Sequence, residues 1–148
     1  MGDNQFKTGG VKWGQYLNLA GVKYFGRTLL RNRGAFVPHL RCRSIAQVNF
    51  EVLRQNRGVK YLVFDKDNTL TLPYERELHP SVSSTVDRLK ELYGPEKIAI
   101  LSNSVGSGED LGGREAAEVE AILGLRVIRH ARKKPEVGDD ILRHFGID

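Results

Sequence analysis

The sequence predicts an α/β fold, a Rossmann-like parallel sheet covered by helices. Three short apolar runs, 61–64, 98–101 and 127–128, alternate with segments of helical periodicity, and the third strand is expected over 125–128. A run that is apolar throughout is typical of a strand buried on both faces. Strands that alternate with helices predict parallel pairing through right-handed crossovers. Because polar residues follow each run, we expect the functional site at the carboxyl edge of this sheet.

The totals are those of one globular domain. The chain has 148 residues, of which 40% are hydrophobic and 28% charged, which is ordinary for a domain that can bury a core. Its single cysteine, Cys42, excludes an internal disulfide and a multi-cysteine zinc site. No run reaches the ~20 uncharged apolar residues that a transmembrane helix needs.

The net charge of +5 is unevenly distributed along the chain. Residues 1–60 hold eleven lysines and arginines against two acidic residues, which gives +9. Residues 61–148 hold twelve against sixteen, which gives −4. A basic segment indicates an anionic partner, such as a phospholipid surface, a nucleic acid or a polyanionic substrate.

The basic segment begins after residues 1–12, which are polar and expected to be disordered. Within 13–43, residues 13–31 predict an imperfect amphipathic helix, aromatic on one side and basic on the other. Such a helix lies in a membrane interface, and the alternative is a helix packed on the domain with a solvated basic face. The predicted membrane contacts are Trp13, Lys23, Arg27 and Arg31.

Residues 44–148 are expected to form the α/β domain. Its helices are predicted at 44–56, 80–92, 113–123 and 135–145. Ser44 is the expected N-cap of the first helix, and Gly58, Gly94 and Gly124 are expected to end the first three helices. Each interval between strands holds one helix, which leaves no room for an inserted cap domain over the site.

Two carboxylates follow the first strand directly. Asp65 and Asp67 are separated by one residue, so a cation is expected beside them, and Mg²⁺ prefers oxygen ligands and often binds together with phosphate. Asp65 could attack phosphorus to form an aspartyl-phosphate, and Asp67 could exchange protons with the leaving oxygen and the attacking water. The alternative for these two residues alone is a capped turn with solvated acids.

Three motifs in this order resemble the haloacid dehalogenase superfamily of phosphatases. Asp65-Lys66-Asp67-Asn68-Thr69 follows the first strand, Ser102-Asn103-Ser104 follows the second, and Lys133-Lys134-Pro135 comes after the third. The residues within these motifs are similar to those of one branch, the mitochondrial phosphatidylglycerophosphate phosphatases and their bacterial relatives. The resemblance covers roughly residues 15–146.

The resemblance implies a role for each motif residue. Asp65 would be the nucleophile and an Mg²⁺ ligand, and Asp67 the general acid/base and a second ligand through its backbone carbonyl. Ser102 would hydrogen-bond the transferring phosphoryl group; taken alone, it would be a strand-end cap. Lys134 would neutralise phosphoryl charge. Expected at the substrate are Thr69, Asn103 and Lys133, the last also being the alternative to Lys134. His130 is expected to support the lysine loop.

The superfamily has a fourth motif, a further strand that ends in acids, one of which completes the Mg²⁺ shell. Gly138-Asp139-Asp140 follows Lys134 too closely and is expected on the surface of the last helix. We therefore expect the sequence to be truncated and its first strand to be a sheet edge with unpaired backbone groups. The expected consequence is a weakly active chain that is prone to association, for which a homo-oligomer is one form.

The function that the resemblance implies is Mg²⁺-dependent hydrolysis of phosphatidylglycerophosphate to phosphatidylglycerol, the precursor of cardiolipin. It implies a peripheral location on the matrix side of the mitochondrial inner membrane, with anionic phospholipid and not nucleic acid as the partner. An open site suits a lipid head group. Two alternatives are a phosphatase of nucleic-acid ends or of a soluble phosphoester, and a non-catalytic membrane-binding relative.

Overall fold

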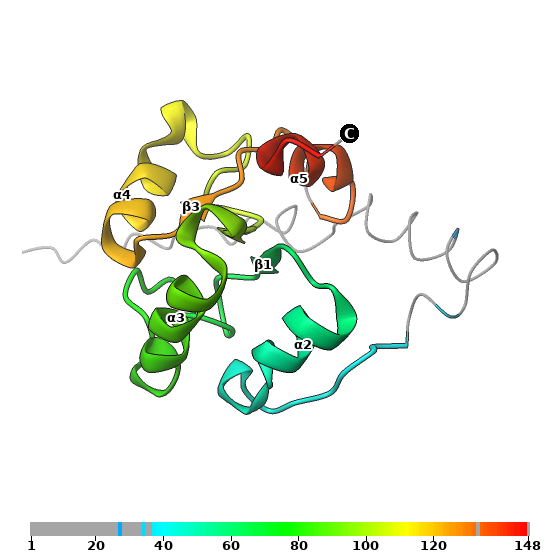
Figure 1. The fold of residues 1–148 in the computed structure, drawn as a ribbon. Helices are drawn as coiled ribbons and strands as arrows, with labels where there is room; N and C mark the ends of the chain where they lie inside the picture. Colours follow the sequence, from blue (N-terminus) through cyan, green and yellow to red (C-terminus); the bar gives the residue numbers. More distant parts are fainter. Residues whose placement is uncertain (1–26, 28–33, 35–36, 133, 148) are drawn as a thin grey trace, which may run out of the picture.

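The computed structural model describes residues 27, 34, 37–132 and 134–147, and a three-stranded parallel sheet lies at the centre of these residues. Strand β1 (Leu62–Phe64) pairs with β2 (Ile98–Ile100), and β2 pairs with β3 (Arg126–Val127). Figure 1 shows the strands between the helices. The predicted α/β class and parallel pairing are confirmed, with strands one or two residues shorter than predicted.

Four α-helices surround the sheet in the described part of the chain. They are α2 (Phe50–Arg57), α3 (Pro80–Tyr93), α4 (Arg114–Leu123) and α5 (Gly138–Phe145). Short 3₁₀ turns occur at Ile45–Gln47 (η3), Pro95–Lys97 (η4) and Leu111–Gly113 (η5). The connection from β1 to β2 holds α3 and no inserted domain, as predicted.

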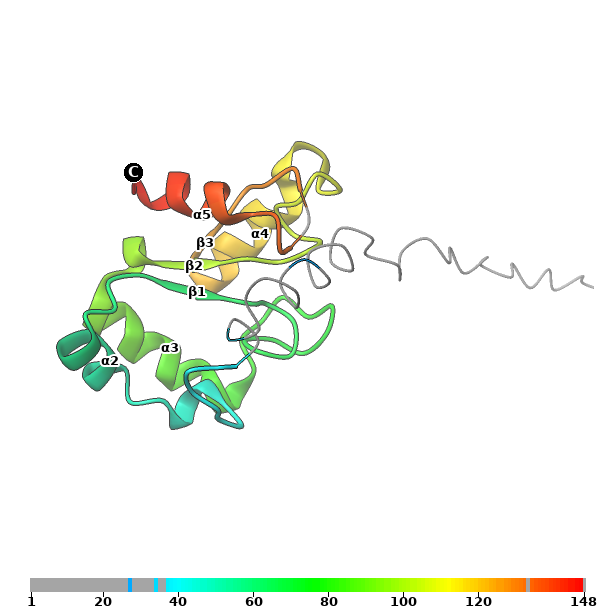
Figure 2. The same ribbon diagram turned by 90° about the vertical axis from the view of Figure 1, so that its right-hand side faces the viewer.

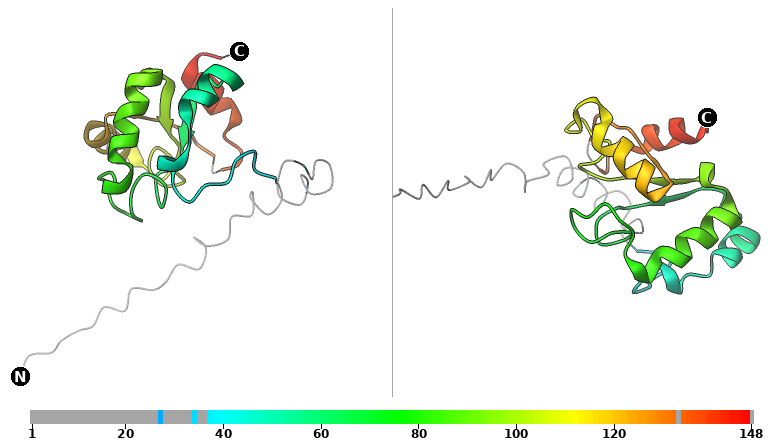
Figure 3. Two further views of the ribbon diagram at one scale, coloured as in Figure 1. Left: turned by 60° about the horizontal axis from the view of Figure 1, so that its bottom comes forward. Right: turned by 90° about the vertical axis from the view of Figure 1, so that its left-hand side faces the viewer.

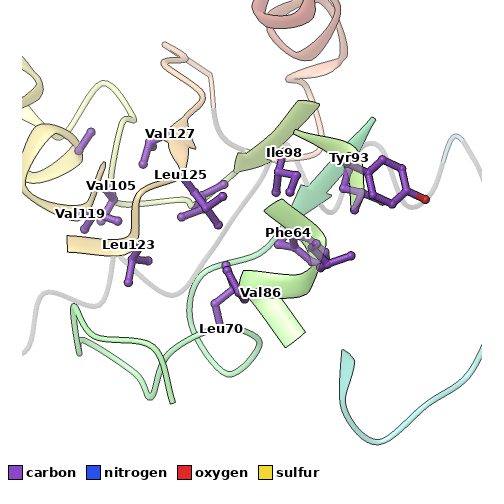
Figure 4. Packing of buried hydrophobic residues seen from close by; sticks show 14 of the residues in the cluster. Phe64, Leu70, Val86, Tyr93, Ile98, Val105, Val119, Leu123, Leu125 and Val127 are labelled. Carbon is purple, nitrogen blue, oxygen red and sulfur yellow. The ribbon is translucent and has the colours of Figure 1, made fainter. Parts of the chain in front are cut away.

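Different helices cover the two faces of the sheet. Ile98 and Ile100 point into a large apolar cluster shared with α2, α3 and α4 (Figure 4). Ala99 and Leu101 point to the other face, where Ile141 and Phe145 of α5 cover them. Alternating side chains on one buried strand therefore build both layers of the core, and α3 and α5 lie on opposite sides of the strands (Figure 2).

The predicted helix at 44–56 is wrong as a single element. Ser44 caps only the η3 turn, where its Oγ accepts the Ala46 N–H at 3.2 Å. The chain is then extended at Val48, and Asn49 starts α2 by accepting the Val52 N–H on its side-chain oxygen at 3.0 Å. Because Asn and Ser side chains compete with backbone groups for hydrogen bonds, two caps five residues apart divide the segment.

Strand β1 is an edge of the sheet formed by the described residues, as predicted. The Tyr61 ring beside this strand contacts the Phe145 ring of α5, with centroids 4.7 Å apart. The predicted membrane helix lies outside the described residues, with Trp13, Lys23 and Arg31; Arg27 is described and exposed. In the part of the chain that the structure describes, no helix is long and apolar enough to cross a membrane.

Candidate active site

The carboxyl ends of the three strands open toward one side of the molecule, where the long connections after β1 and β2 lie (Figures 2 and 3). Residues far apart in the sequence meet there. Lys134 Nζ lies 2.5 Å from Asp65 Oδ1, and the Lys134 backbone N–H donates to Asn103 Oδ1 at 3.0 Å. The structure therefore brings one residue of each predicted motif into contact at the edge where the site was expected.

Asp65 and Lys134 form an accessible ion pair. The Asp65 side chain is 48% exposed and that of Lys134 is 29% exposed. Lys134 Nζ also donates to the Leu101 carbonyl at 3.2 Å, so the end of β2 holds the ammonium group in place. A carboxylate that solvent can reach, with a fixed cation beside it, has the arrangement that a nucleophile toward phosphorus needs. Lys133 lies outside the described residues.

Asp67 is held in a tight turn beyond β1. Its Oδ1 accepts hydrogen bonds from Lys66 Nζ at 2.5 Å and from the Tyr74 N–H at 3.1 Å. The turn closes through the Asn68 N–H, which donates to the Thr71 carbonyl at 2.9 Å, while Asn68 has a left-handed φ of 60°. Asn tolerates this conformation better than most residues, so the motif sequence suits the turn.

Lys66 and Thr71 are site residues that our sequence analysis missed. Lys66 is 3% exposed and Thr71 is 2% exposed, although Asp65 before Lys66 and Leu72 after Thr71 are exposed. The sequence signal for the burial of Lys66 was the alternation of buried and exposed side chains along the strand. Leu62 and Phe64 are buried, Asp65 is exposed and Lys66 is buried again, so the alternation continues past the end of β1.

Ser102 is 1% exposed, and its contacts are those of a strand-end cap. Its Oγ accepts the Ser104 N–H at 3.3 Å. Its carbonyl faces His130 Nε2 at 2.7 Å, and the other ring nitrogen of His130 contacts the Arg132 carbonyl. The buried imidazole therefore links the end of β2 to the loop that carries Lys134, which agrees with the expected support of this loop.

Thr69 lies on the other side of the turn, where it lines a pocket of about 460 Å³. Arg43 and His79 also line this pocket, and none of its lining residues in the described part of the chain is acidic. The Thr69 N–H approaches the Lys66 carbonyl at 3.4 Å. Thr69 thus lies within the turn that follows β1, but the role of Thr69 at the substrate, like those of Ser102 and Asn103, stays a prediction.

Asp110, also missed by our sequence analysis, anchors the loop that follows Ser102-Asn103-Ser104. Its buried carboxylate accepts three backbone N–H groups, from Gly106 at 2.9 Å, Ala116 at 2.9 Å and Glu115 at 3.0 Å. Burial by itself raises the pKa of Asp110, but these three donors, with the nearby Arg129 guanidinium, outweigh it and lower the pKa. The carboxylate therefore fastens this loop to the start of α4.

Gly106 in the same loop needs to be glycine. Its φ is +76°, and a Cβ at this position would lie 2.8 Å from the Ile128 carbonyl oxygen. Any side chain would therefore be strained and would push the loop away from β3.

Replacing Asp110 by Ala is expected to lower the free energy of unfolding by about 2 kcal/mol, because three backbone N–H donors, two of them in buried hydrogen bonds, lose a charged acceptor. Because the folded-state pKa is lowered, the carboxylate stabilises the fold above its unfolded pKa of about 3.9 and stops doing so as the pH falls through the folded-state pKa. Urea denaturation from pH 7 to pH 3 measures this. A difference between the two proteins that does not shrink toward pH 3 would contradict it.

The donor set suits Mg²⁺ only in part. The Asp65 carboxylate and the Asp67 backbone carbonyl are hard oxygen donors at an open edge, and Mg²⁺ commonly binds one or two carboxylates and keeps several waters. Among the residues that the structure describes, no group of three His, Cys, Asp or Glu side chains could hold a metal. Asp139 and Asp140 lie in the first turn of α5, where Arg132 and Arg143 pair with them. The prediction that these two residues belong to the last helix is confirmed.

The comparisons with known proteins agree on one family. A family model described as mitochondrial PGP phosphatase matches residues 20–148. Phosphatidylglycerophosphate phosphatase 1, chloroplastic/mitochondrial, from Arabidopsis thaliana is 36% identical over 135 residues, and its chloroplastic counterpart from Chlamydomonas reinhardtii is 40% identical over 134. A probable mitochondrial phosphatidylglycerophosphatase from Schizosaccharomyces pombe is 28% identical over 137 residues.

These alignments include 90%, 89% and 87% of the present chain, respectively, and only 38%, 49% and 65% of the three relatives. The chain therefore spans less than two thirds of the length of each of these proteins. No solved structure matches the chain.

Proposed function

The chain belongs to the mitochondrial PGP phosphatase family, and we propose that it hydrolyses the terminal phosphate of phosphatidylglycerophosphate to give phosphatidylglycerol in mitochondria. The observation that carries this proposal is the contact of Asp65 with Lys134 at the open edge of the sheet. The names of the relatives support the substrate. A peripheral position on the matrix side of the inner membrane belongs to the same proposal.

In the first step, a carboxylate oxygen of Asp65 attacks phosphorus, and the bond from phosphorus to the glycerol oxygen breaks. Asp67 donates a proton to that oxygen, which leaves as the hydroxyl of phosphatidylglycerol. In the second step, Asp67 takes a proton from water, the water oxygen attacks phosphorus, and the bond from Asp65 to phosphorus breaks. Lys134 stays beside Asp65 and stabilises the negative charge on the phosphoryl oxygens in both steps.

Asp65, through its carboxylate, and Asp67, through its backbone carbonyl, would hold the Mg²⁺ ion. The bound ion neutralises charge on the phosphoryl group and on the attacking carboxylate. Lys134 supplies a positive charge beside Asp65, so its ammonium group can bind the phosphoryl oxygens while a carboxylate oxygen of Asp65 faces phosphorus. Water, or acids beyond the described residues, would complete the coordination of the ion.

The test of this function is phosphate release from vesicles that contain phosphatidylglycerophosphate, measured with Mg²⁺ and with EDTA. Release that depends on Mg²⁺ is the expected result. A DNA oligonucleotide with a terminal phosphate and glycerol 3-phosphate serve as competing substrates. Faster turnover of either one would favour the alternative phosphatase functions over the lipid.

Exposed apolar side chains near the site support contact with a membrane. Tyr74 is 97% exposed, Leu111 is 84% exposed and Leu72 is 54% exposed. All three lie in the connections that leave the carboxyl ends of β1 and β2 (Figure 3). An aromatic ring with a polar tip suits the membrane interface. We include the bilayer surface in the proposal, with these three side chains entering it so that the open site reaches the head group.

Replacing Leu72, Tyr74 and Leu111 together by Ser is expected to weaken binding to anionic vesicles about tenfold, since each loses apolar area that the interface would bury. Vesicle flotation measures binding, and turnover of 4-nitrophenyl phosphate, which needs no membrane, should change little. The matched control replaces Val52, Ile122 and Leu142, which are exposed on helices α2, α4 and α5. Equal losses of vesicle binding in both triple variants would contradict a membrane role for the site loops.

A further inference from the structure

A buried lysine stands between the two acids of the proposed mechanism. Lys66 is 3% exposed, whereas Asp65 on one side is exposed and Asp67 on the other is half-buried. Lysine is almost never fully buried unless it is paired. The burial of an ammonium group beside a reacting carboxylate therefore needs a physical explanation. The proposed roles of Asp65 as nucleophile and of the phosphoryl group do not explain it.

The Lys66 ammonium group has three partners, and each lies in the turn beyond β1. It is 2.5 Å from Asp67 Oδ1, 3.3 Å from Thr71 Oγ1 and 2.8 Å from the Glu75 carbonyl. Three donors of an ammonium group thus meet three acceptors. One acceptor is charged and the other two are neutral, so Asp67 is the partner that balances the charge.

These bonds single out one oxygen of Asp67. Oδ1 accepts both the Lys66 ammonium and the Tyr74 N–H, whereas no hydrogen bond to Oδ2 occurs among the described residues. The carboxylate is thereby held through Oδ1. The side chain as a whole is one third exposed to solvent. A general acid works through one oxygen, which has to point at the atom it protonates.

From this arrangement we infer that Lys66 is a positioning residue, which holds Oδ1 of Asp67 so that Oδ2 exchanges the proton with the leaving oxygen and with water. The inference rests on the proposed function, because it takes Asp67 as the acid/base. The bond from Lys66 to the Glu75 carbonyl also fixes the segment after Thr71, whose Tyr74 N–H is the second donor to Oδ1. One lysine therefore serves each acid, Lys134 at Asp65 and Lys66 at Asp67.

The test compares two substrates in order to distinguish a loss of Asp67 positioning from a general loss of folded protein. An alkyl phosphate such as phosphatidylglycerophosphate has a poor leaving group that needs a proton, whereas the nitrophenolate of 4-nitrophenyl phosphate leaves without one. Lys66→Met is expected to lower kcat on the alkyl phosphate by about tenfold to a hundredfold, part of the roughly 10²–10⁴ that general acid catalysis supplies. On the aryl phosphate the loss should stay within about threefold, with KM for both substrates little changed.

The ratio of the two activities does not depend on how much of the protein is folded, because both are measured on one preparation. Lys90→Met is the matched control, since Lys90 is a partly buried lysine of α3 that donates to the Leu123 carbonyl at 2.8 Å, away from the proposed site. Its ratio should equal that of the unchanged chain. If Lys66→Met gives no soluble protein, Lys66→Gln provides the same comparison with a polar side chain. Equal losses on both substrates would overturn the inference.

A double-mutant cycle gives a second, independent measurement. If Lys66 acts through Asp67, then Lys66→Met should cost no further activity on the alkyl phosphate once Asp67 is replaced by Asn. Additive losses would show that Lys66 acts elsewhere. If the unchanged chain turns over the aryl phosphate but not phosphatidylglycerophosphate, the proposed lipid substrate has failed and not the inference, and glycerol 3-phosphate then serves as the alkyl phosphate.

Discussion

Asp65→Asn is expected to lower phosphate release from phosphatidylglycerophosphate by at least about a thousandfold, because an amide cannot replace a carboxylate as nucleophile. The side chain is nearly half exposed and its one described ion pair is with Lys134, so the fold should persist. Thermal unfolding of both proteins checks the fold. Phosphate release from vesicles, with Mg²⁺ and with EDTA, measures the activity.

The matched control is Asp139→Asn, which removes a carboxylate that is 78% exposed on α5 and pairs with Arg132. Its activity should equal that of the unchanged chain. A second measurement looks for the intermediate itself. Brief reaction with radiolabelled substrate, followed by acid quenching, should leave phosphate on the protein only when Asp65 is present. Full activity of Asp65→Asn would exclude the aspartyl-phosphate route, and unchanged vesicle binding without any activity in either protein would favour the non-catalytic alternative.

Lys134→Met is expected to lower kcat by about a hundredfold, the magnitude typical of removing one fixed group that stabilises transition-state charge. Met matches the lysine side chain as far as Cε but lacks the ammonium group that lies 2.5 Å from Asp65 Oδ1. Because that group would bind the charge that develops on the phosphoryl oxygens, KM should change less than kcat. Steady-state kinetics on vesicles and on 4-nitrophenyl phosphate should show losses of similar size, in contrast to the expectation for Lys66.

Two further variants make this prediction specific. Lys60→Met removes an exposed lysine that precedes β1, at the opposite edge of the sheet, and should leave kcat unchanged. Lys133→Met tests the alternative that our sequence analysis left open, since either lysine before Pro135 fits the motif. A large loss in Lys133→Met together with a small one in Lys134→Met would assign the charge-stabilising role to Lys133.

Features that depend on short stretches of chain could be predicted before the fold was known. The apolar runs marked all three strands, and Gly58, Gly94 and Gly124 end α2, α3 and α4 as the sequence predicted. The order of three motifs behind these strands placed the site at the carboxyl edge of the sheet and indicated the family. These signals are local, because strand burial, helix caps and tight turns depend on residues only a few positions apart.

Which of these residues are in contact depends on the tertiary structure. Asp65 and Lys134 are 69 positions apart and meet because β1, β2 and β3 pair side by side, which brings the loop after β3 to the end of β1. Asp110 reads as a loop acid, yet it accepts three backbone N–H groups once its loop folds against α4. A lysine between two acidic residues is typical of a solvated surface, yet the turn closes over Lys66 and supplies three acceptors. A polar side chain becomes buried when distant backbone groups satisfy it, and those partners are fixed by packing rather than by its neighbours in the sequence.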